Sequence, residues 1–72
     1  MPLPQHRKKL GESVRKYRKK AEFSQEKLAE EANLSAVFIS DVERGVENIS
    51  VDAIARIAKA LRIRISDLFK DA

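Results

Sequence analysis

The chain has 72 residues, and a domain of this length buries only roughly 60% of the surface that its unfolded chain exposes. It contains no cysteine, which excludes disulfides and thiolate zinc sites and favours a reducing compartment, by default the cytoplasm. No apolar run approaches the roughly 18 residues of a membrane span, and the N-terminal MPLPQHRKKL lacks the apolar stretch of a signal peptide.

The net charge of +4 is unevenly distributed along the chain. Residues 1–20 hold eight Lys or Arg and one acid, whereas residues 21–47 hold two Lys or Arg and seven acids. A basic segment beside an acidic one suits a polyanion that touches part of the surface, and it equally suits a solvated face. Charge alone leaves these two interpretations open.

The first element in chain order is a helix. Residues 1–6 contain both prolines and are expected to form a flexible arm, with His6 as a solvated tail residue, ahead of a single domain over residues 7–72. Apolar residues then recur at helical spacing in Leu10, Val14, Tyr17 and Ala21, which predicts a helix ending near Ala21. Both glycines are interpreted as helix boundaries.

Three further helix starts share one pattern, in which a serine is flanked by a pair of apolar residues: FSQEKL, LSAVFI and ISVDAI. The serine can cap the first exposed amides while the apolar pair closes a hydrophobic staple. The pattern predicts helices over residues 25–32, 36–44 and 51–61, the second of these stopping at Gly45. The tail ISDLFKDA adds a short fifth helix, and LRIRI is interpreted as a connector because it has no partner strand.

Helices 25–32 and 36–44 are separated by a very short connection, so they must cross at a steep angle. Ala29 provides the small side chain required at the closest approach, and Asn33 occupies a position that needs positive φ. The apolar residues expected to hold the pair together are Leu28, Ala32, Leu34, Ile39 and Val42.

The chain resembles the helix-turn-helix family of lambda repressor, Cro and the xenobiotic-response-element regulators. The resemblance is carried by SQEKLAEEANLSAVFISDVERG, by the following NISVDAIARIAKAL and by a closing LF. ISDVERG with NIS is similar to restriction-modification controller proteins. The resemblance implies an all-α, five-helix lambda-repressor-like fold with its helix-turn-helix at the second and third helices. It also implies a homodimeric transcriptional regulator, typically a repressor, whose third helix enters the major groove of palindromic double-stranded DNA.

The resemblance assigns DNA-contacting roles to particular positions. Gln25 is expected to bond a phosphate beside the free amides of its helix, and Arg44 and Asn48 are expected to donate to phosphates. With Ile39 and Val42 buried, the opposite face of their helix carries the base-reading positions. The complete set of expected DNA-binding residues is Ser24, Gln25, Ser35, Ala36, Val37, Phe38, Ser40, Asp41, Arg44 and Asn48.

Positions 35–38 depart from the family pattern because they contain no Arg, Lys, Gln or Asn. Ala36 or Val37 can still fit against a thymine methyl, and Asp41 can accept from cytosine N4 or anchor Arg44 instead. Phe38 can pack on the DNA or against the second helix, and DNA shape can add specificity. A protein-interaction module, such as an antitoxin or adaptor, is the alternative that this apolar surface favours.

Two further sets of residues follow from the resemblance. Arg18 and Glu43 match an ion pair that bridges the first and third helices, a structural rather than a DNA-contacting role. The expected dimer interface consists of Ile63, Ile65, Leu68 and Phe69, whose alternative is an ordinary cap on the core. No cofactor, metal or small-molecule ligand is expected. The single histidine and the lack of a glycine-rich phosphate loop also argue against an enzyme.

Overall fold

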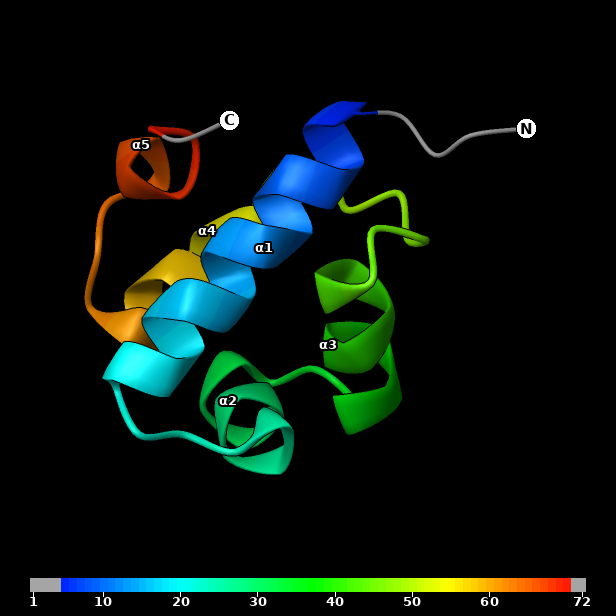
Figure 1. The fold of residues 1–72 in the computed structure, drawn as a ribbon. Coiled ribbons are helices and arrows are strands. Elements are labelled where there is room, and N and C mark those ends of the chain that lie inside the picture. Colours follow the sequence, from blue (N-terminus) through cyan, green and yellow to red (C-terminus); the bar gives the residue numbers. More distant parts are fainter. Residues whose placement is uncertain (1–4, 71–72) are drawn as a thin grey trace.

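The computed structural model describes residues 5–70, and within them the chain forms five α-helices and no strand (Figure 1). Their bounds are α1 Gln5–Lys20, α2 Gln25–Ala32, α3 Ala36–Glu43, α4 Val51–Leu61 and α5 Ile65–Leu68. The α1 helix lies in front of α4 and runs in nearly the same direction, and α3 and α5 lie on opposite sides of α1 (Figure 1). The expected all-α, five-helix class is confirmed. None of the helices within residues 5–70 has the length and apolar character needed to cross a bilayer.

Serine capping sets the first residue of α2, α3 and α4. In each case an extended serine accepts a hydrogen bond at its Oγ from the backbone N–H three residues later, which satisfies one of the amides left free at a helix start. The N···O distances are 2.9 Å for Ser24, 3.0 Å for Ser35 and 3.1 Å for Ser50. The predicted starts of these three helices are therefore confirmed.

The helix ends depend on left-handed residues. Asn33 follows α2 with φ of 57°, as predicted, and Gly45 follows the end of α3 with φ of 76°. The αL conformation at Asn33 directs the N–H of Leu34 to the carbonyl of Ala29 at 2.8 Å, which closes the turn between α2 and α3. Glu22 and Arg62 also have positive φ, at 61° and 59°, and neither is the residue type that normally predicts such a turn.

Two expectations for α1 are wrong. The helix begins at Gln5, so Gln5 and His6 belong to it and not to a flexible arm; residues 1–4 of that arm lie outside the described residues. The helix extends past its apolar stripe because the intervening Arg and Lys residues are good helix formers. Gly11 is not a boundary either: it lies inside α1, where an added Cβ would stand 2.3 Å from the carbonyl oxygen of Val42.

The core lies where α1, α2, α3, α4 and α5 meet. Its largest fully buried side chains are Val14, Leu28, Ile39, Ile57 and Leu68. Ala29 is 3% exposed at the crossing of α2 and α3, as its small size predicted. This packing fixes the buried face of α3 and leaves the opposite face to solvent.

Candidate nucleic-acid interface

The solvent-facing side of α3 carries a short row of side chains. Val37 is 71% exposed, and one turn later the Asp41 side chain is 31% exposed. Ile39 and Val42 are buried on the other side, so the helical period separates the two faces as predicted. An exposed valine in the first turn of a helix contributes little to packing within the subunit.

Asp41 is paired with Arg44 on this surface. The Nη1 of Arg44, the residue that caps the C-terminus of α3, donates to Oδ1 of Asp41 at 3.3 Å, which is a long contact. The Arg44 side chain is 67% exposed, so the pair is held loosely and its net contribution to stability is small. The guanidinium partly compensates the carboxylate charge that would otherwise repel a polyanion.

The other expected contact residues differ in how they present themselves. Ala36 and Phe38 are half-buried and pack against the core, which is the packing alternative for Phe38. Ser24 and Ser35 are exposed, and their oxygens cap helices while each hydroxyl hydrogen stays able to donate. Ser40 is half-buried and Asn48 is exposed in the connection between α3 and α4.

The structure contains the ion pair expected between Arg18 and Glu43, and it joins α1 to the end of α3. Arg18 Nε donates to Glu43 Oε2 at 2.6 Å, and Arg18 Nη2 donates to Glu43 Oε1 at 3.1 Å. Arg18 Nη1 also donates to the carbonyl of Phe23 at 2.8 Å, which fixes the connection to α2. The two side chains are 12% and 5% exposed, so the pair is largely removed from water.

Gln25 is a third partner in this network, which the sequence interpretation missed. Its Nε2 donates to Glu43 Oε1 at 3.1 Å, so one carboxylate links α1, α2 and α3. The signal for it is the capacity of a carboxylate to accept about four hydrogen bonds, more than one guanidinium uses. The second Nε2 hydrogen of Gln25 remains available to another acceptor.

The C-terminal apolar residues divide into two groups. Ile65 is 40% exposed and Phe69 is 43% exposed, whereas Ile63 is half-buried against the core. Leu68 is 0% exposed, so its expected place in a dimer interface is wrong. It is buried because α5 packs against both α1 and α4, and the side of α5 that faces them must supply an apolar anchor.

The outer face of α1 is basic. Arg15, Lys16, Lys19 and Lys20 are all exposed, in agreement with the charge distribution in the sequence. The ammonium groups of Lys16 and Lys20 lie 5.4 and 5.6 Å from the ring centroid of Tyr17, close enough for cation–π attraction. This face adds positive potential without supplying a shaped site.

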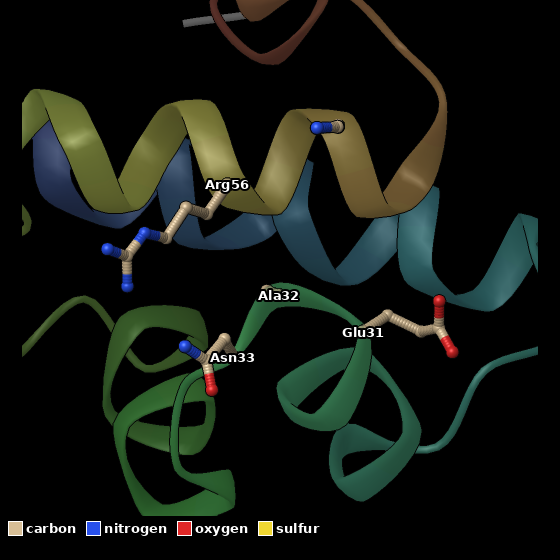
Figure 2. A pocket seen from close by; sticks show the side chains of 5 residues that line it. Glu31, Ala32, Asn33 and Arg56 are labelled. Carbon is tan, nitrogen blue, oxygen red and sulfur yellow. The ribbon is translucent and has the colours of Figure 1, made fainter.

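A pocket of about 400 Å³ lies between α2 and α4 and is lined by Glu31, Ala32, Asn33, Arg56 and Lys59. Arg56 projects from α4 on one side of it, and Asn33 lies on the opposite side (Figure 2). None of the expected DNA-contacting residues lines this pocket. Among residues 5–70, no group of three or more His, Cys, Asp or Glu side chains is arranged to hold a metal ion.

Comparisons with known proteins agree with this geometry. The family model described as helix-turn-helix matches residues 14–68. The control protein C.BamHI of Bacillus amyloliquefaciens is 48% identical over 60 residues, which are 82% of this chain and 74% of that protein. The control protein C.MunI of a Mycoplasma species is 34% identical over 64 residues, 88% of this chain and 86% of that protein.

A solved structure shows the same similarity in three dimensions. The restriction-modification controller protein C.AhdI of Aeromonas hydrophila superposes with a TM-score of 0.85 at 37% identity, covering 86% of this chain and 94% of that one. The chain therefore belongs to the helix-turn-helix family and is a DNA-binding transcriptional regulator of the controller-protein type.

Proposed function

We propose that this protein binds double-stranded DNA sequence-specifically as a homodimer, with α3 lying in the major groove of a palindromic operator. The observation that carries the proposal is the exposed row on α3, Val37 with Asp41 and Arg44, on a helix whose opposite face is buried. The similarity of the chain to restriction-modification controller proteins supports a narrower role, the regulation of the genes of such a system.

Contacts to the DNA backbone position α3 in this proposal. Ser24 and Gln25 lie at the start of α2, where free backbone amides favour a phosphate. Gln25 donates one Nε2 hydrogen to Glu43 and offers the other to the phosphate. Arg44 and Asn48 are exposed at the far end of α3 and donate to phosphates there.

The proposed dimer forms through the exposed side of α5. Ile65 is the first residue of α5 and Phe69 is its C-cap, and each leaves about two fifths of its surface in water. A two-fold contact buries both pairs at once. It would place the two copies of α3 against half-sites about 34 Å apart, one turn of DNA.

Binding to random duplex DNA at two salt concentrations tests the proposal, with a charge change on α3 as the decisive variant. DNA binding by this surface predicts an affinity that falls steeply with salt, because each neutralised phosphate releases a counterion. Val37→Asp should abolish specific binding and leave the melting temperature nearly unchanged, because the side chain is exposed.

Lys59→Glu is the matched control. It changes the charge by two units instead of one, on an exposed part of α4 away from α3, so it should weaken binding less than Val37→Asp. Equal losses in the two variants would mean that overall charge, and not α3, governs binding. Negligible, salt-independent affinity for every duplex would favour the protein-interaction module.

A further inference from the structure

We infer that Val37 and Asp41 act as one unit that reads a pyrimidine C5 methyl group lying beside an exocyclic amino donor. The inference rests on the proposed function, because it requires α3 to lie in the major groove. It goes further by naming the chemical feature that the protein selects there.

The geometry of α3 puts the two side chains together. Val37 and Asp41 are four residues apart on the exposed face, which separates their Cβ atoms by about 5–6 Å. Val37 is 71% exposed, so it offers a methyl-sized apolar surface to any partner. Asp41 offers a carboxylate whose only hydrogen bond within the described residues is the one from Arg44 at 3.3 Å.

The positions next to Val37 offer few groups that could hydrogen-bond to a base edge. Ala36 and Phe38 are half-buried, and the Ser35 oxygen already accepts from the Phe38 amide. The first turn of α3 therefore has no long donor to reach the N7 and O6 acceptors of guanine. Apart from the short hydroxyl groups of Ser35 and Ser40, reading by this helix depends on an apolar contact from Val37 and on hydrogen-bond acceptance at Asp41.

Base edges in the major groove meet these two requirements in a restricted way. Thymine presents a C5 methyl group next to the O4 acceptor, which a carboxylate repels, whereas cytosine presents its N4 amino donor without a methyl group. The pair is satisfied when a methyl group and an amino donor are adjacent. One 5-methylcytosine has both, and so does a thymine beside an amino-bearing base, which is either a cytosine with its N4 donor or an adenine with its N6 donor.

Arg44 makes an acidic reader compatible with a polyanion. Its guanidinium bonds Asp41 and is 67% exposed, so it can also reach a phosphate beside the groove. The carboxylate then carries a compensating charge when it approaches the DNA. A charge-compensated acceptor of this kind selects amino donors at the base edge.

The test begins with duplexes selected by the wild-type protein from two random pools, one with ordinary bases and one with 5-methylcytosine in place of cytosine. Each preferred duplex is remade with uracil replacing single thymines, or cytosine replacing single methylcytosines, so that one methyl group is removed at a time. Affinities are measured for the wild type, Val37→Ala and Asp41→Asn. Val51→Ala and Asp52→Asn are the controls, because Val51 is 76% exposed and Asp52 forms an ion pair with Arg56 on α4.

Removing the methyl group that Val37 contacts should weaken wild-type binding about fourfold, the value of one buried methyl group. The same removal should have a clearly smaller effect on Val37→Ala, whose single methyl group reaches less far, and both controls should behave as the wild type. Asp41→Asn should relax the preference for the adjacent amino-bearing base. A loss on replacing a thymine by uracil assigns the methyl group to that thymine beside an amino-bearing base, and a loss confined to the methylated duplex assigns it to 5-methylcytosine.

Two results overturn the inference while leaving the proposed function standing. One is specific, salt-sensitive binding that no methyl removal alters. The other is a methyl effect of equal size in the wild type and Val37→Ala, because the methyl group is then read by another residue. Failure to select any duplex from either pool removes the proposed function and this inference with it.

Discussion

Replacing Gly11 by alanine sets two opposing effects against each other. Gly11 lies in the interior of α1, where alanine favours a helix by about 1 kcal/mol relative to glycine. Its added Cβ, however, would stand 2.3 Å from the carbonyl oxygen of Val42 and 2.7 Å from that of Glu43. Both neighbours are backbone atoms of α3, so neither can rotate away, and the two helices must separate.

The clash is the larger effect. Overpacking typically costs about 1–3 kcal/mol, and contact with rigid backbone places this case near about 3 kcal/mol. After the propensity gain of about 1 kcal/mol, a net loss of about 2 kcal/mol remains. In a domain of this size that corresponds to a melting temperature lower by about 10 °C.

Thermal unfolding followed by circular dichroism measures the change, with Glu12→Ala as the control on an exposed position of the same helix. Operator affinity should fall in Gly11→Ala as well, because α3 is displaced along with its network. An unchanged or raised melting temperature would refute the reasoning, since it would mean that α1 and α3 do not approach each other this closely.

Three further perturbations test the network, the α5 surface and the α5 cap. Arg18→Met should cost about 3–5 kcal/mol in urea unfolding, because it leaves the buried Glu43 carboxylate without its cation and with only Gln25 as a partner. Combining Arg18→Met with Glu43→Leu should recover part of this loss, and no recovery would mean that the pair is not responsible. Phe69→Asp should give monomers in sedimentation with the fold retained, and dimers that persist in this variant would remove α5 from the interface. Leu68→Ala should instead lower the free energy of unfolding by about 2–5 kcal/mol, because Leu68 is fully buried. The pKa of Asp67 lies below its ordinary value of 3.8, chiefly because the backbone N–H of Arg64 donates to it and then because of Lys70. Its stabilising effect is complete above the unfolded pKa and is lost as pH falls through the lowered folded pKa, so α5 should loosen in strong acid, and Asp67→Asn should abolish that acid transition in amide NMR.

The local features of this fold could be predicted from the sequence because they depend on residues a few positions apart. Ser24, Ser35 and Ser50 each set a helix start through a bond three residues ahead, and Asn33 takes the left-handed conformation that it tolerates. The exposure of Val37 followed from helical periodicity in the same way.

The features that the sequence analysis missed depend on contacts between distant segments. Gly11 is required by a close approach to α3, and Leu68 is buried because α1 and α4 both face α5. The bond from Gln25 to Glu43 spans 18 residues. The left-handed conformations of Glu22 and Arg62 have no local signal, because neither residue type favours them over other conformations.

The carboxylate of Glu43 has a mechanical consequence. Because it is shared by Arg18 and Gln25, three helices are tied at one point, which resists rotation of α3 by itself. A duplex bound by this protein would meet a stiff template, so that a poor match strains the nucleic acid before it strains the protein. Sequences that bend or twist easily at the right step would then gain affinity even at base pairs that no side chain touches.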